Sequence, residues 1–147
     1  TTVVRSGDIA EMSVLHNKLF GPLRMCFNPE TVVCHRVYRT VQPPDKETTE
    51  HIPAMADKAE GRVLALGDSF SRIYEDDSPG YAGWVSHLCN ELNEPVKLIY
   101  SNGGAASNVR KTLAAQPQKL NGKRLVVWEL VERDLRYAMD GWIYVDI

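Results

Sequence analysis

The chain has few cysteines, almost no excess charge and only short apolar runs, and each of these absences excludes a class of protein. Its 3 cysteines among 147 residues form neither a disulfide framework nor a CxxC metal motif. The 17 basic and 19 acidic side chains give a net charge of -2, which favours neither nucleic acid nor an anionic membrane as partner. No apolar run approaches the roughly 18 residues of a membrane-spanning helix, and the first residues lack the pattern of a signal peptide. What is left is a chain with 44% hydrophobic residues, enough for one globular core.

The cysteines leave one choice open. A bridge between Cys26 and Cys34 would close a short loop in an oxidising compartment, whereas small buried thiols are the commoner state. Cys89 lies in a helical pattern, and we expect it in the core.

Two parts of the chain differ in pattern. We expect the less regular residues 1–61 to be an N-terminal segment and linker of the same domain whose patterned core is residues 62–147. In the first part, Asp8 is suited to cap a short helix over IAEMSVL, and TVVCHRVYR alternates as one strand. The stretch 41–61 gathers three prolines and many charges, which predicts an exposed connection with no strand across its middle.

Short apolar runs alternate with amphipathic segments in the second part. Strands are expected at Arg62–Leu66, Val96–Tyr100 and Arg124–Trp128, and helices at Gly80–Leu92, with Pro79 in the first turn, and at Asn108–Ala115. This order with short connections predicts right-handed crossovers and a parallel sheet in an α/β fold. Ligand sites in such sheets lie at the carboxyl ends of the strands.

The first of these strand ends carries Gly67, Asp68 and Ser69. A tight turn at Gly67 would present the Ser69 hydroxyl and its backbone N–H above the sheet, which is nucleophile geometry. Asp and Ser also commonly cap the next turn, and these three residues alone favour that role. The second strand end adds Asn102, Gly103 and Gly104, whose backbone N–H groups suit an oxyanion. The two turns together favour the nucleophile.

A serine nucleophile needs a base, usually a histidine oriented by a carboxylate. The four histidines are His16, His35, His51 and His87, and none has an Asp two or three residues before it. His87 is expected to be an ordinary helix residue, and His16 would reach the site only if the N-terminal segment folded over the sheet. The chain therefore contains no Asp-x-His unit.

Charged side chains follow the glycine-rich turn and the third strand. Glu129 comes at the carboxyl edge of the sheet, where it can face the site. We expect Glu132, Arg133 and Asp134 to form ordinary surface pairs three or four residues apart. Arg110 either orients a carboxylate or sugar hydroxyl or is a solvated helix arginine, and the sequence leaves this choice open.

Three segments, GRVLALGDSFSRIY, SNGGAASNVRKTLA and KRLVVWELVERDL, together resemble the SGNH hydrolase superfamily and, within it, the alginate O-acetyltransferase branch. The opening SGDIAEMSVL is similar to a segment that follows the catalytic Asp-His motif of that branch. The resemblance implies a three-layer α/β/α, flavodoxin-like fold, with Ser69 as the nucleophile and Gly103 and Gly104 as the oxyanion-hole glycines. The superfamily's GxND block is absent after the third strand, which leaves Asn102 as a substitute donor.

The same resemblance implies the activity of the parent protein. Ser69 would take an acetyl group as a covalent ester and pass it to a polysaccharide hydroxyl, with no metal or other cofactor. The location implied is periplasmic or otherwise exported, and the implied partner is a membrane-bound acyltransferase that supplies acetyl groups. The branch keeps its base in an Asp-x-His-Trp motif before the serine. That motif is absent here and the chain starts without Met, so we expect a piece of a longer precursor that is inactive by itself.

Two other functions stay open. A carbohydrate esterase would pass the acyl group to water, and an excess of oligosaccharide would divert acyl groups from hydrolysis only in a transferase. A non-catalytic carbohydrate-binding or scaffolding domain would keep the fold without the base.

Overall fold

A computed structural model describes residues 2–5, 30–53, 61–103, 105–137 and 143–146, which belong to two compact units, Thr1–His35 and Arg36–Ile147. The second unit includes the described residues 36–53 as well as the sheet. In the first unit, β1 (Thr2–Arg5) pairs antiparallel with β2 (Glu30–Val33). The helix expected over IAEMSVL lies outside the described residues, as do His16 and Cys26.

The second unit begins with a β-hairpin. Its strands β3 (Tyr38–Val41) and β4 (Glu50–Pro53) pair antiparallel, with Val41 opposite Glu50. Two predictions are therefore wrong. The run TVVCHRVYR is divided between β2 and β3, and the stretch rich in proline and charge does contain a strand. Pro53 is compatible with this strand because β4 belongs to a two-stranded sheet and is therefore an edge strand, where proline is tolerated.

A three-stranded parallel sheet forms the centre of the second unit. β5 (Val63–Gly67) lies between β6 (Val96–Tyr100) and β7 (Leu125–Trp128). The α/β class and the parallel sheet are confirmed, and each strand begins and ends within one residue of its predicted position. All five residues of β5 are buried, as expected for a central strand covered on both faces.

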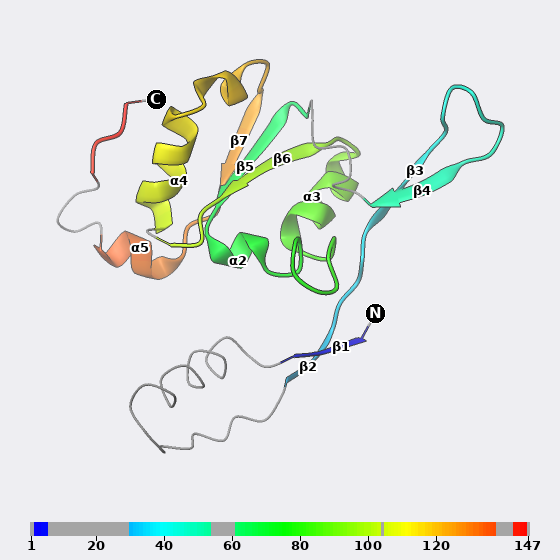
Figure 1. The fold of residues 1–147 in the computed structure, drawn as a ribbon, viewed down its shortest axis with the longest axis horizontal. Coiled ribbons are helices and arrows are strands. Elements are labelled where there is room, and N and C mark those ends of the chain that lie inside the picture. Colours follow the sequence, from blue (N-terminus) through cyan, green and yellow to red (C-terminus); the bar gives the residue numbers. More distant parts are fainter. Residues whose placement is uncertain (1, 6–29, 54–60, 104, 138–142, 147) are drawn as a thin grey trace. The chain divides into compact units, whose positions relative to one another are not determined.

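Two helices cover opposite faces of this sheet (Figure 1). On one face, α3 (Trp84–Leu92) packs through Val85 and Cys89 against Val63 and Ala65. On the other, α4 (Ala105–Ala114) packs through Val109 and Leu113 against Leu64 and Leu66. Alternate residues of β5 point to alternate faces, so one strand serves both halves of the core.

Two helices begin elsewhere than predicted. α3 begins at Trp84 because Gly80 and Tyr81 have φ values of 75° and 54°, which an α-helix does not contain, so Pro79 lies in the preceding loop. α4 begins at Ala105, three residues before the predicted start. The other helices of the described residues are the short α2 (Ser69–Arg72), α5 (Glu132–Tyr137) and the 3-10 turn η1 (Pro117–Leu120). Among the helices of the described ranges, none is both long and apolar enough to cross a bilayer.

The two described cysteines are buried. Cys34 and Cys89 are 6% and 0% exposed, and neither forms a disulfide. Burial raises the pKa of Cys89, which keeps the thiol protonated and poorly reactive. Cys89 therefore belongs to the core, as expected.

A buried carboxylate ties the loop after α2 to the start of α3. Glu75 is 3% exposed and accepts hydrogen bonds from the Ser86 N–H at 2.8 Å and the Ser86 hydroxyl at 2.6 Å. A Cβ on Gly83 would lie 2.5 Å from Glu75 Oε1, so only glycine fits there. Burial raises the pKa of Glu75, although the bonds from Ser86 act in the opposite direction.

We predict that the Glu75 carboxyl group makes the stability of the fold depend on pH. The raised pKa means that the folded chain holds the Glu75 proton more tightly than the unfolded chain does. The free energy of unfolding should then fall as the pH rises from the ordinary value of 4.5 through the folded pKa. Glu75→Gln has no titrating carboxyl group at this position, so the difference in unfolding free energy between variant and wild type should shift in favour of the variant as the pH rises above 4.5. Urea denaturation of both proteins across this range tests the prediction. A difference between them that stays constant with pH would contradict it.

Candidate functional site

The candidate site lies where β5 and β7 end. The chain runs from β5 to β6 through α3 on one face and reaches β7 through α4 on the other face. The carboxyl ends of β5 and β7 are therefore neighbours where the direction of winding changes, and α/β sheets bind ligands at such places. β5 leads through Asp68 into α2, and β7 leads into Glu129.

Close packing, rather than a left-handed turn, requires glycine at position 67. Gly67 does not have a positive φ. A Cβ there would lie 1.9 Å from Ser71 Oγ and 3.0 Å from Glu129 Oε2. The absence of a side chain thus lets α2 and Glu129 approach the end of the central strand.

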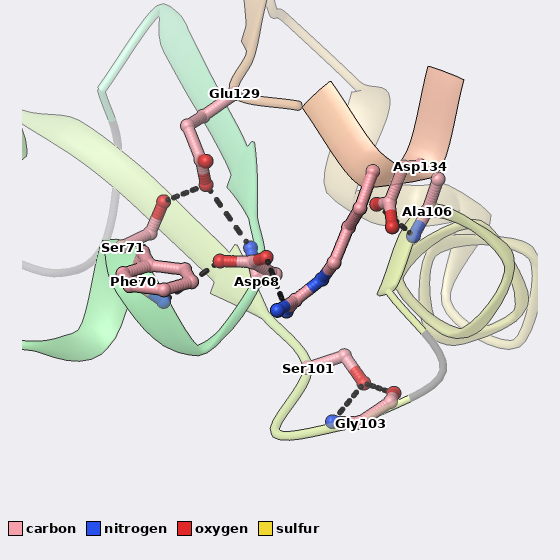
Figure 2. Close-up of polar contacts among 9 residues, drawn as sticks. Asp68, Phe70, Ser71, Ser101, Gly103, Ala106, Glu129 and Asp134 are labelled. Carbon is pink, nitrogen blue, oxygen red and sulfur yellow. Dashed lines mark hydrogen bonds and ion pairs between the residues drawn. The ribbon is translucent and has the colours of Figure 1, made fainter. Parts of the chain in front are cut away.

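Glu129 joins the end of β7 to the turn after β5. Its Oε2 accepts hydrogen bonds from the Ser71 hydroxyl at 2.8 Å and from the Asp68 N–H at 3.3 Å (Figure 2). Ser71 Oγ also accepts a bond from Trp84 Nε1 at 3.1 Å, which extends the network to α3. The sequence made Glu129 a candidate for substrate binding. In the structure its carboxylate holds the protein's own turn.

Asp68 caps the helix that Ser69 begins. Its Oδ1 accepts the Phe70 N–H at 2.7 Å, and its side chain is buried. The buried Oδ2 has no hydrogen-bond partner among the described residues, and the guanidinium of Arg133 lies 3.8 Å from it. The capping role considered for this residue is therefore present, and it shapes the turn around Ser69.

Ser69 lies at the carboxyl end of the central strand, as predicted. It is the first residue of α2 and is half-buried. Its hydroxyl makes no hydrogen bond to any residue that the structure describes. The N–H of a first helical residue also lies outside the helix's own hydrogen-bond ladder. Both groups are thus available to a substrate.

The glycine-rich turn after β6 is adjacent to the same strand end. The Ser101 N–H donates to the Gly67 carbonyl at 3.2 Å. Ser101 Oγ donates to the Gly103 carbonyl at 2.5 Å and accepts the Gly103 N–H at 3.4 Å, so this N–H is weakly engaged. Asn102 is exposed, and Gly104 lies outside the described residues. An oxyanion site shared by Ser69 and this turn stays a prediction.

We expected surface pairs three or four residues apart for the charged residues of α5, and the structure shows contacts of Asp134 and Arg133 with other elements. Asp134 is 8% exposed, and its Oδ2 accepts the Ala106 N–H at 3.2 Å, which stabilises the first turn of α4. Arg133 reaches Asp68 instead of a neighbour on its own helix. Sequence reasoning missed these contacts, and that of Ser71, because their partners are distant in the chain.

The other sequence candidates make contacts of their own. Arg110 donates from Nε to the carbonyl of Ala106, one turn back in its own helix, at 3.2 Å. His35 and His87 are exposed, and His51 lies 3.2 Å from Thr40 Oγ1. None of these three histidines hydrogen-bonds to Ser69 or to a carboxylate of the described ranges. The described residues also contain no group of three or more metal-binding side chains.

We predict that Glu129→Ala destabilises the fold by about 1–3 kcal/mol, because it leaves the Ser71 hydroxyl and the Asp68 N–H without their acceptor. Glu132→Ala is the matched control: Glu132 is an exposed carboxylate three residues away, and its loss should cost no more than about 0.5 kcal/mol. Urea denaturation of the two variants measures both values. Equal stabilities would show that the Glu129 network contributes nothing.

The chain was compared with family models, curated proteins and solved structures, and none of them matches it.

Proposed function

We propose that the protein is a serine-dependent acyltransferase, a polysaccharide O-acetyltransferase with an SGNH-like fold, and that Ser69 is its nucleophile. The observation that carries the proposal is the state of Ser69. Its hydroxyl is unengaged within the described part of the chain, and it lies at the end of the central parallel strand. The turn that holds it is fixed on both sides of the serine, by Glu129 at the Asp68 N–H and by Asp68 at the Phe70 N–H.

The sheet supports the finer fold assignment. The strand order β6-β5-β7, with helices on both faces, suits a flavodoxin-like α/β/α sandwich. The nucleophile of such a fold is expected after its central strand, which is the position of Ser69.

The reaction would proceed in two acyl transfers. The Ser69 oxygen attacks the carbonyl carbon of an acetyl ester, its proton passes to an imidazole base, and the carbonyl electron pair moves to the oxygen. When the carbonyl re-forms, the donor alcohol leaves with the proton, and the acetyl group remains on Ser69. A sugar hydroxyl then attacks this ester in the same way and regenerates the serine.

Backbone N–H groups would stabilise the oxyanion in both transfers. The N–H groups of Ser69 and of Gly103 or Gly104 are the proposed donors, with Asn102 as a side-chain substitute. Removing one such donor typically costs about 3 kcal/mol of transition-state stabilisation. The Gly103 N–H would have to exchange its long 3.4 Å bond to Ser101 Oγ for the oxyanion.

The partners follow from the resemblance. A polysaccharide is the acceptor, and a membrane-bound acyltransferase supplies acetyl groups to an exported protein. The reaction requires no metal or organic cofactor. The sequence contains no Asp-x-His unit that would identify the imidazole base, because none of its histidines is preceded by Asp at the required spacing.

We predict that the 147-residue chain turns over an acetyl ester slowly, but faster than its Ser69→Ala variant. The absence of an oriented base typically costs on the order of 10⁴ to 10⁶ in kcat, which leaves binding and the oxyanion donors. The unfolding free energy of the variant should lie within about 1 kcal/mol of that of the wild type, since the hydroxyl bonds to none of the described residues.

The measurement is turnover of p-nitrophenyl acetate with an oligosaccharide present, recording both released acetate and O-acetylated sugar. A Ser69→Ala variant that is as active as the wild type would contradict the proposal that Ser69 is the nucleophile. An advantage of about a thousandfold or more for the wild type would show that a base exists in this chain, and His16→Ala and His87→Ala would be tested first.

A further inference from the structure

Arg133 contacts the serine turn, by which we mean residues 68–71, from a different element of the fold. It is the second residue of α5, and its side chain is 57% exposed. Its guanidinium makes one contact on each side of Ser69: Nη2 lies 3.8 Å from Asp68 Oδ2, and Cζ lies 5.7 Å from the centroid of the Phe70 ring. The cation is therefore held against both neighbours of the proposed nucleophile.

The hydrogen-bond donors of this guanidinium are unused by the described residues. A guanidinium carries five N–H donors in a planar fork. The distance of 3.8 Å to Asp68 is too long for a hydrogen bond, and the contact with Phe70 involves the face of a ring. Arg133 can thus donate to a ligand oxygen without breaking a hydrogen bond in this part of the protein.

Asp68 explains why the guanidinium stays in place. Its carboxylate is buried, Oδ1 is occupied by the Phe70 N–H, and Oδ2 has no hydrogen-bond partner. A buried carboxylate requires a compensating charge, and Arg133 supplies the cation recorded beside it. Phe70, which is 48% exposed, supports the guanidinium from the other side.

We propose that Arg133 is a catalytic residue that stabilises the oxyanion formed when Ser69 attacks an acyl carbonyl. This inference rests on the proposed function of Ser69. The carbonyl electron pair moves to oxygen as the serine oxygen bonds to carbon, and an Arg133 N–H donates to that oxygen. The proton of Ser69 goes to the base. A donor that meets the charge only as it develops lowers the barrier without tightening ground-state binding.

The chemical class of ligand follows from this geometry. A planar cation whose N–H donors are unused by the described residues, held against the two neighbours of Ser69, suits a tetrahedral or trigonal-bipyramidal centre that bears a negatively charged oxygen. A fluorophosphonate supplies such a centre without a dedicated general acid: the Ser69 oxygen displaces fluoride from phosphorus, and a solvent base takes the proton. This reagent therefore reports on Arg133 without requiring the full acetyl-transfer reaction.

The test is the rate at which Ser69 is phosphonylated in the full chain at mildly alkaline pH, followed by intact mass and assigned by peptide fragmentation. We expect Arg133→Gln to react about tenfold to a thousandfold more slowly than the wild type. Arg136→Gln is the matched control, because Arg136 is an exposed arginine one turn along α5, and it should react at the wild-type rate. Rates are expressed per folded protein, as measured by circular dichroism.

The outcomes separate the two proposals. A loss of less than about tenfold in Arg133→Gln, with Ser69 labelled, overturns the role of Arg133 and leaves the nucleophile standing. No labelling of Ser69 in the wild type overturns the proposed function and this inference with it. If Arg133→Gln does not fold, Arg133→Met preserves the packing on Phe70, and its rate is judged by the same limit.

Discussion

The bonds from the Glu129 carboxylate to the serine turn are the constraint on which the site depends. One oxygen of this side chain accepts from the Ser71 hydroxyl and the Asp68 N–H, so the end of β7 holds the segment that leaves β5. The approach is so close that position 67 has no room for a side chain. The carboxylate thereby fixes the residues on both sides of Ser69 and leaves the Ser69 hydroxyl unengaged among the described residues.

Other carboxylates of the second unit also accept hydrogen bonds from backbone N–H groups. Asp68 caps α2, Asp134 accepts from the first turn of α4, and Glu75 accepts from the first turn of α3. Each places an acceptor at N–H groups that a helix cannot satisfy by itself. Acidic residues that look like surface charges in the sequence therefore bind helix starts around the carboxyl edge of the sheet. Asp68 also contacts Arg133, whose guanidinium donates no hydrogen bond to the described residues.

The sequence predicts those features that depend on short stretches of chain. The parallel strands could be located within one residue because each is an apolar run, and Ser69 could be placed because it directly follows one of them. The contacts that build the site could not be predicted, because their partners are far apart in the sequence. Glu129 and Ser71 are separated by 58 residues, and Asp134 and Ala106 by 28. β4 was missed because a hairpin depends on its partner strand as well as on its own composition. The start of α3 was missed because the left-handed backbone of Tyr81 is unusual for a residue with a bulky side chain.

The most direct test of the account is to find the acyl group on the enzyme. After incubation with an acetyl ester and acid quenching, tryptic digestion releases the peptide Val63–Arg72, which contains both Ser69 and Ser71. The account predicts an acetyl group on Ser69, because its hydroxyl is unengaged, and none on Ser71, because its hydroxyl is bound to Glu129. An unmodified peptide, or acetylation at Ser71 instead, would contradict it.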